Sequence, residues 1–375
     1  MHVWPVWRDM RKARNEDMYD MFDYLEWRGD LSFKKIGPNP VDMLIFSTLS
    51  YINFDGIVSE NPNKIMPLRE AAEQFLVLPD KEKKVRVKKD IELLEAAINT
   101  ERFANVGVSF YRNVFAPEEE KQFAAITYYP GDGTAILTFR GTDRTLIGWK
   151  EDFNMTFQDT IPAQREALKY LEEYAVNRLE PIRMSGHSKG GNIAVFAAAK
   201  ADSEIQQRIV EIHNQDGPGF PESMMNDDGY LTIVPKIYSF VPESSIVGIL
   251  LEHMEPHTII KSKKIGPLQH DPYSWEVMRD DFIHKEHMSG GSQLVDQATT
   301  AWLAGMTPDE RSELSDVIFD FVTSGGAVRT EDLIHPKQIA NYVKSLVKDE
   351  AKRTTIISSL SHLVRAFIDA QRGEE

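Results

Sequence analysis

The sequence contains no cysteine, which excludes disulfide scaffolds, thiolate metal sites and cysteine nucleophiles. Basic residues are also scarce: 43 Lys and Arg stand against 58 Asp and Glu, so the formal net charge is −15. A protein that binds nucleic acid needs a basic face to displace counterions. The charge balance therefore argues against nucleic acid as a partner.

Long hydrophobic runs are missing as well. The longest apolar stretches, such as residues 246–251, are much shorter than the roughly 20 residues of a membrane-spanning helix. Residues 1–20 lack the apolar core of a secretory signal. We therefore expect a cytoplasmic protein with no integral membrane segment, for which peripheral contact with lipid stays open. The sequence does not indicate an oligomeric state.

Apolar residues make up 42% of the sequence, which is enough for a sizeable core. Their spacing divides the sequence into three zones. Residues 1–102 show mainly helical spacing of apolar positions, and this region is expected to pack on the core. Residues 103–290 alternate between strand-like and helix-like patterns, which predicts an α/β core with a mostly parallel sheet flanked by helices. Residues 291–375 return to helical spacing.

The predicted strands and helices can be placed by residue number. We expect strands near residues 106–111, 123–129, 134–139, 181–184, 209–213, 236–241 and 258–262, and helices near 163–178 and 188–200. In the last zone, Thr307 and Glu310 form a capping-box pattern, which predicts the start of a helix. Gly325 is expected to end that helix. Two more amphipathic helices are predicted near residues 339–346 and 356–367.

The strongest motif is Gly186-His187-Ser188-Lys189-Gly190. A short predicted strand precedes it and an alanine-rich predicted helix follows it. A serine on so sharp a turn needs small neighbours because its backbone is strained. The helix N-terminus would also direct unpaired N–H groups at an anion formed beside Ser188 Oγ. The pattern therefore favours Ser188 as a nucleophile, since a phosphate-binding loop would have a different glycine spacing.

A second motif, Arg140-Gly141-Thr142, ends the strand predicted at 134–139. The amide of Thr142 would lie at the carboxyl edge of the sheet, where a second oxyanion donor belongs beside the amide of Lys189. The alternative is that Arg140 and Asp152 form an ion pair and Thr142 only caps a turn.

Together these motifs carry a family resemblance. Residues 134–275 resemble the catalytic core of the fungal-type (class 3) lipases, which carry a Phe-Arg-Gly-Ser/Thr strand end, a Trp-x-x-Asp and a Gly-His-Ser-Leu-Gly-Gly elbow. The segments FRGTDRTLIGWKEDFNMTF, SGHSKGGNIAVFAA, NQDGPGF and QHDPYSWEV are more similar still to a bacterial family of lipase-like α/β-hydrolases known as a domain of unknown function. The resemblance implies an α/β-hydrolase fold, a serine hydrolase mechanism and no cofactor.

In this fold the acid and the histidine follow the serine along the chain. His270 lies in the loop after the last predicted strand, where the fold keeps its histidine, so we predict it to be the base. Asp216 and Glu243 each follow a predicted strand, and either could orient His270. Glu243 stands where the lipases place Asp. Asp216 is favoured because its shorter side chain on a Gly-Pro-Gly turn fixes the geometry better.

Lys189 departs from the lipase pattern, which has leucine there. Its cation would either pair with a surface carboxylate or contact an anionic group of the substrate. No metal site is predicted, because His284 and His287 lack the four-residue spacing of a helical zinc pair, and Pro256 breaks the helix that the pair His253/His257 would need.

The sequence thus predicts a serine hydrolase that cleaves a carboxylic ester or thioester of an acyl, lipid-like substrate. The alternatives are a binding protein of the same fold with a non-functional triad, and an acyltransferase.

Overall fold

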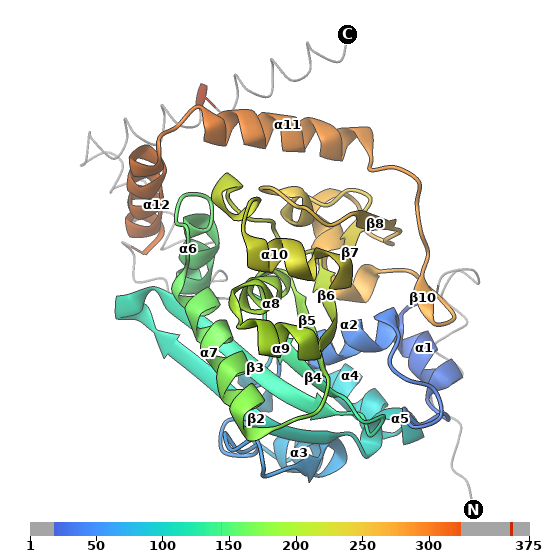
Figure 1. Ribbon diagram of the computed structural model, residues 1–375. Coiled ribbons are helices and arrows are strands. Elements are labelled where there is room, and N and C mark those ends of the chain that lie inside the picture. The colour runs from blue at the N-terminus through green and yellow to red at the C-terminus, as the bar shows by residue number, and fades with distance from the viewer. Residues whose placement is uncertain (1–18, 144, 324–360, 363–375) are drawn as a thin grey trace, which may run out of the picture.

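The computed structural model describes residues 19–143, 145–323 and 361–362. In this part of the chain an eight-stranded sheet forms the centre of the molecule, and its strands lie side by side in chain order (Figure 1). The first three pairings are antiparallel and the last four are parallel. The strands are β1 (Met66–Pro67), β2 (Gly107–Ala116), β3 (Lys121–Tyr129), β4 (Ala135–Phe139), β5 (Ile182–His187), β6 (Ile209–Gln215), β7 (Ile237–Pro242) and β8 (His257–Ile260).

Helices cover both faces of the sheet, as the alternating side chains of its strands require. Leu137 and Phe139 on β4 face one apolar cluster, whereas Ile136, which directly precedes Leu137, belongs to the other. The first cluster includes α7 (Pro162–Asn177), α8 (Lys189–Lys200) and α10 (Asp228–Ile233). The second includes α1 (Met21–Arg28), α2 (Pro40–Leu49), α3 (Leu68–Leu76), α4 (Lys88–Ile98) and α5 (Glu101–Ala104). The predicted α/β fold, a mostly parallel sheet flanked by helices, is confirmed.

All seven predicted strands and both core helices occur, with bounds that differ by a few residues. The elements that were not predicted include β1, α6 (Leu146–Asn154), α9 (Ser203–Arg208) and α10, which are too short for a periodic apolar pattern to stand out. A separate two-stranded ribbon pairs β9 (Val277–Met278) with β10 (Asp281–Phe282).

Two helices of the last zone are described, α11 (Gly290–Ala304) and α12 (Pro308–Thr323). The capping box at the start of α12 is confirmed, since Thr307 N donates to Glu310 Oε2 and Glu310 N donates to Thr307 Oγ1. Gly325 and the helices predicted at 339–346 and 356–367 lie outside the described residues, apart from residues 361–362.

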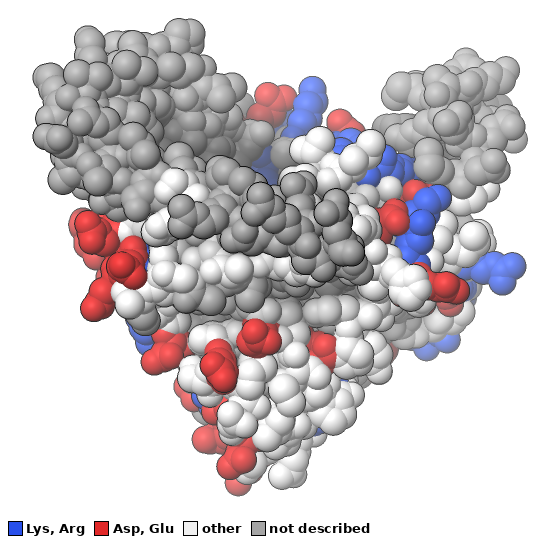
Figure 2. Space-filling view, turned by 90° about the horizontal axis from the view of Figure 1, so that it is seen from above, with Lys and Arg blue, Asp and Glu red and all other residues white. Residues whose placement is uncertain are grey.

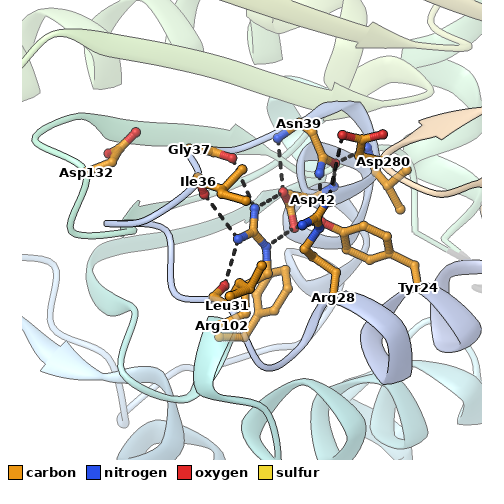
Figure 3. Close-up of polar contacts among 12 residues, drawn as sticks. Tyr24, Arg28, Leu31, Ile36, Gly37, Asn39, Asp42, Arg102, Asp132 and Asp280 are labelled. Atoms are coloured by element: carbon orange, nitrogen blue, oxygen red, sulfur yellow. Dashed lines mark hydrogen bonds and ion pairs between the residues drawn. The ribbon is translucent and has the colours of Figure 1, made fainter.

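A buried ion pair ties the N-terminal helices together (Figure 3). Arg102 donates to both carboxylate oxygens of Asp42, at 2.8 and 2.6 Å, and both side chains are fully buried. Tyr24 Oη donates to the same carboxylate at 2.8 Å. The two-pronged pairing holds α2 and α5 in a fixed relation. The N-terminal helices share their apolar core with β2, β3 and β4, and the division at residues 102 and 290 stays a prediction.

Charge is spread unevenly over the surface. On the face seen from above, acidic side chains gather at the left and below, and basic ones at the upper right (Figure 2).

No helix in the described ranges has both the length and the apolar character that crossing a bilayer requires.

Candidate active site

Ser188 sits on the sharp turn between β5 and α8, in a backbone conformation of φ 61° and ψ −136°. An L-residue adopts positive φ only at an energetic cost, so the surrounding contacts must hold it there. A Cβ on Gly186 would collide with the backbone of Gly190, and one on Gly190 with the carbonyl oxygen of Phe139. The glycines therefore permit the close packing of β4, β5 and α8 that places the serine at the sheet edge.

His270 and Asp216 form a hydrogen-bonded pair. His270 Nδ1 donates to Asp216 Oδ2 at 2.6 Å, which leaves its Nε2 as the ring nitrogen available to exchange a proton. Asp216 follows β6, has a positive φ of 56° and is fully buried. Its second oxygen accepts a hydrogen bond of 2.5 Å from Ser245 Oγ. Both oxygens are thus fixed, and so is the histidine tautomer.

Glu243, the alternative acid, lies elsewhere in the hydrogen-bond network. Its carboxylate pairs with Lys285 Nζ at 3.1 Å, and its side chain is partly exposed. The loop after β7 instead contributes Ser245, two residues further on, to the acid that contacts His270. The geometry therefore favours Asp216 over Glu243.

Thr142 lies three residues after the end of β4 and is held by Asp152. Thr142 Oγ1 lies 2.7 and 2.6 Å from the two carboxylate oxygens of Asp152. Burial raises the pKa of Asp152 to about 6, and the nearby charges of Lys189 and His270 lower it in part. Arg140 does not pair with Asp152; it contacts Asp143 at 3.8 Å and Asn113 at 3.1 Å. The alternative in which Arg140 and Asp152 form an ion pair is therefore wrong.

The side chain of Lys189 does not reach a surface or a substrate position. It is completely buried and pairs with Glu151 at 2.7 Å, and Glu151 is equally buried. Its Nζ also donates to Gln122 O and to Gln122 Oε1. The expectation of a surface partner or an anionic substrate group is corrected, because three protein acceptors already use the ammonium. Its main-chain amide, the first of α8, still has no acceptor within the helix.

Two residues that the sequence did not indicate lie beside His270. His187 Nε2 donates to the carbonyl oxygen of His270 at 2.8 Å, and Tyr51 Oη lies 3.0 Å from His187 Nδ1. His187 belongs to the elbow motif, and its place before the serine on a strand was the available signal. Tyr51 follows α2, and no pattern in the sequence connects it with the elbow.

The hydrogen-bond chain stops short of the serine. Within the described residues no hydrogen bond joins Ser188 Oγ to His270 Nε2. Catalytic hydrogen bonds are often long or poorly aligned without substrate and tighten when it binds. The structure thus provides a fixed acid–histidine pair and a serine with a strained backbone, each of which follows a strand at the carboxyl edge of the sheet.

Comparison with known protein families identifies the family of the chain. A model of the Mbeg1-like family matches residues 97–320, which is more than half of the chain and includes Ser188, Asp216 and His270. The chain belongs to the Mbeg1-like family. The chain is thus a lipase-like α/β-hydrolase relative, as its sequence resemblance indicated.

Other comparisons are more distant. No curated protein matches the chain. Among solved structures, the crystal structure of a mutant form of MDLA from Penicillium cyclopium matches with 16% identity and a TM-score of 0.38. The match covers 67% of this chain and 87% of that chain. The Mbeg1-like family and the fold together suggest an ester hydrolase.

Proposed function

We propose that the protein is a serine hydrolase that cleaves a carboxylic ester or thioester of an acyl, lipid-like substrate through an acyl-enzyme. The observation that carries the proposal is the contact of 2.6 Å between His270 Nδ1 and the buried carboxylate of Asp216, at the sheet edge where Ser188 is held at positive φ. Strained backbone concentrates at functional sites. A histidine with one nitrogen fixed by a buried carboxylate is the arrangement that general-base catalysis needs.

In the proposed reaction, Ser188 Oγ attacks the carbonyl carbon of the ester, and His270 Nε2 takes the hydroxyl proton. Asp216 stabilises the imidazolium that forms. The amides of Thr142 and Lys189 hold the oxyanion of the tetrahedral intermediate, each lowering the barrier by about 3 kcal/mol. His270 then protonates the leaving alcohol or thiol, and water hydrolyses the acyl-enzyme by the same proton transfers in reverse order. No cofactor takes part.

A fluorophosphonate probe tests the proposal, because it reacts covalently with an activated serine. We expect the wild-type protein to be labelled and Ser188→Ala to be unlabelled. An unlabelled wild type would contradict the proposal and favour a binding protein of the same fold. Product analysis with an added alcohol acceptor separates hydrolysis from acyl transfer.

The acid is tested by comparing Asp216→Asn with Glu243→Gln. Loss of the carboxylate that fixes the histidine tautomer should lower kcat by about 10⁴. We expect that loss for Asp216→Asn and little change for Glu243→Gln, which serves as the matched control. Equal, small losses would contradict the assignment of either acid.

The substrate class is tested with a series of p-nitrophenyl esters of increasing acyl length, with and without an anionic group. Because the Lys189 ammonium is used by Glu151 and Gln122, we expect this residue to confer no preference for the anionic esters. A preference that disappears in a Lys189→Met variant that still folds would contradict this expectation.

A further inference from the structure

Three polar groups form a continuous chain behind the proposed base. Tyr51 Oη lies 3.0 Å from His187 Nδ1, and His187 Nε2 lies 2.8 Å from the carbonyl oxygen of His270. Tyr51 and His187 are buried, at 3% and 1% exposed. This chain of hydrogen bonds connects the residues that follow α2, the end of β5 and the loop after β8, which are far apart in the sequence.

The direction of both hydrogen bonds is fixed by chemistry. The carbonyl oxygen of His270 can only accept, so Nε2 of His187 must carry the proton. Burial, together with the nearby charges of His270 and Arg86, holds the pKa of His187 well below its usual value. The ring is therefore neutral, and its bare Nδ1 accepts from the hydroxyl of Tyr51. Burial raises the pKa of Tyr51 to about 12, so the phenol keeps its proton.

Tyr51 also lies next to the reacting serine. A Cβ added to Gly141 would collide with Tyr51 Oη and would lie only 3.1 Å from Ser188 Cβ. The phenol and the serine therefore lie around the same glycine, one residue before Thr142. Tyr51 is outside residues 97–320, the part that matches the family model. A residue of the N-terminal helical region thus completes the surroundings of a site built by the core.

We propose that Tyr51 and His187 are positioning residues for His270. Tyr51 fixes the tautomer of His187, and His187 fixes the main chain of His270 through its carbonyl oxygen. The inference rests on the proposed function and adds two residues to it. Neither residue touches the reacting atoms in this scheme.

The physical reason is that His270 needs two anchors. Its ring is held at Nδ1 by Asp216, but rotation about that contact would still move Nε2 relative to Ser188. The bond from His187 fixes the other end of the residue, at the carbonyl group. A displacement of about 1 Å at a reacting group can cost 10²-fold in rate. The neutral ring of His187, centred 4.6 Å from that of His270, also adds no positive charge beside the imidazolium.

The variants separate positioning from packing. Tyr51→Phe removes one hydroxyl and keeps the ring. His187→Leu removes the donor to His270, whereas His187→Gln keeps an amide N–H of similar reach. Tyr128→Phe is the matched control, because Tyr128 is equally buried on β3 and its hydroxyl has no hydrogen-bond partner within the described ranges. Melting temperatures show whether each variant folds.

The readouts are kcat and KM for a p-nitrophenyl ester, the rate of fluorophosphonate labelling, and ¹⁵N NMR of the His187 ring. We expect kcat and the labelling rate to fall about 10-fold in Tyr51→Phe and about 100-fold in His187→Leu, with KM nearly unchanged. His187→Gln should recover most of the loss, and Tyr128→Phe should match the wild type. The NMR spectrum should show a neutral ring protonated at Nε2.

Four outcomes would contradict the proposal. The first is a wild-type kcat in both Tyr51→Phe and His187→Leu, and the second is a rise in KM in these variants without a fall in kcat. The third is a folded His187→Gln variant that recovers none of the activity lost in His187→Leu. The fourth is an NMR spectrum that shows the His187 ring protonated at Nδ1. Suppose that the probe labels the wild type and not Ser188→Ala, and that the Tyr51 and His187 variants react like the wild type. That result would overturn this inference and leave the proposed function standing. An unlabelled wild type would overturn the proposed function and this inference with it.

Discussion

Gly141 lies between the proposed oxyanion donor Thr142 and the strand end of β4. A Cβ there would collide with Tyr51 Oη and with the main-chain oxygen of His187, and only the tyrosine could move aside. We therefore expect Gly141→Ala to shift the Thr142 segment away from Ser188. The rate of fluorophosphonate labelling should fall at least about 10-fold, since one misplaced oxyanion donor costs that much or more.

The matched control is Gly290→Ala, because nothing lies within 4 Å of a Cβ added to Gly290. It should label at the wild-type rate. Normal labelling of Gly141→Ala would show that the Thr142 amide does not serve the oxyanion.

Asp152 makes stability depend on pH in a defined direction. Burial raises its pKa to about 6, above the value of about 3.9 for an unfolded aspartic acid. The folded state therefore binds this proton more tightly, and the resulting stabilisation is present below about pH 4 and is lost as the pH rises to about 6. Asp152→Asn removes the titration.

We expect the free energy of unfolding of Asp152→Asn, relative to the wild type, to rise by on the order of 2 kcal/mol between pH 4 and pH 7. Urea denaturation at several pH values measures this difference. Val77→Ala, a non-titrating change at an exposed position, should give a difference that does not vary with pH. A pH-independent difference for Asp152→Asn would contradict the raised pKa.

The candidate triad could be predicted from the sequence because each residue has a local signal. Ser188 lies between glycines, and Asp216 and His270 follow strands at the edge where this fold builds its site. Tyr51 could not be predicted, since its contact with His187 joins residues 136 positions apart and leaves no local pattern. The role of Lys189 was mispredicted because its buried partner, Glu151, comes from a helix that the sequence did not reveal.

That helix, α6, meets α8 and β3 at one buried charge cluster. Glu151 accepts from Lys189 Nζ and from the main-chain amides of Gln122 and Ala163. Lys189→Met would leave the carboxylate buried without its counter-charge. We expect the free energy of unfolding to fall by about 3–5 kcal/mol, measured by urea denaturation.

Adding Glu151→Gln to Lys189→Met should restore part of this loss, because it removes the uncompensated buried charge and its single oxygen can still accept from the amide of Ala163. Lys200→Met is the control on the same helix: Lys200 pairs with Asp227 at the surface, and such pairs contribute under about 1 kcal/mol. A small loss of unfolding free energy in Lys189→Met would mean that the pair contributes little to holding α6 on α8.

The longer elements were predictable because apolar periodicity marks them. β4, β5 and α8 carry the site, and each was placed within a few residues. The short helices α6, α9 and α10 have six to nine residues, too few for a periodic pattern to stand out. The hydrogen bond from Ser245 Oγ to Asp216 could not be predicted from the sequence, since that contact depends on how the loop after β7 folds back.

At the scale of the whole molecule, one apolar cluster contains residues from both sides of the predicted boundary at residue 102. Helices of the N-terminal region share an apolar cluster with β2, β3 and β4, and this cluster extends to Trp275, beyond His270. Tyr51 comes from the same region. We therefore expect the N-terminal helices and the catalytic core to unfold together.

Arg102 allows that expectation to be tested, because its guanidinium binds Asp42 and the main-chain oxygens of Leu31 and Ile36 (Figure 3). Arg102→Met leaves the Asp42 carboxylate buried and unpaired, which should lower the free energy of unfolding by about 3–5 kcal/mol. Hydrogen exchange followed by mass spectrometry measures the loss of protection separately in α2 and in β5.

If the two regions form one cooperative unit, protection in α2 and in β5 should fall by the same free energy, and a single unfolding transition should remain. Lys285→Met, which removes a partly exposed partner of Glu243, should leave both unchanged within about 1 kcal/mol. A loss confined to α2 would instead make residues 1–102 an independently folding unit. In that case Tyr51 would be delivered to His187 by docking of one domain on another, and labelling of Ser188 should then weaken in Arg102→Met before β5 loses protection.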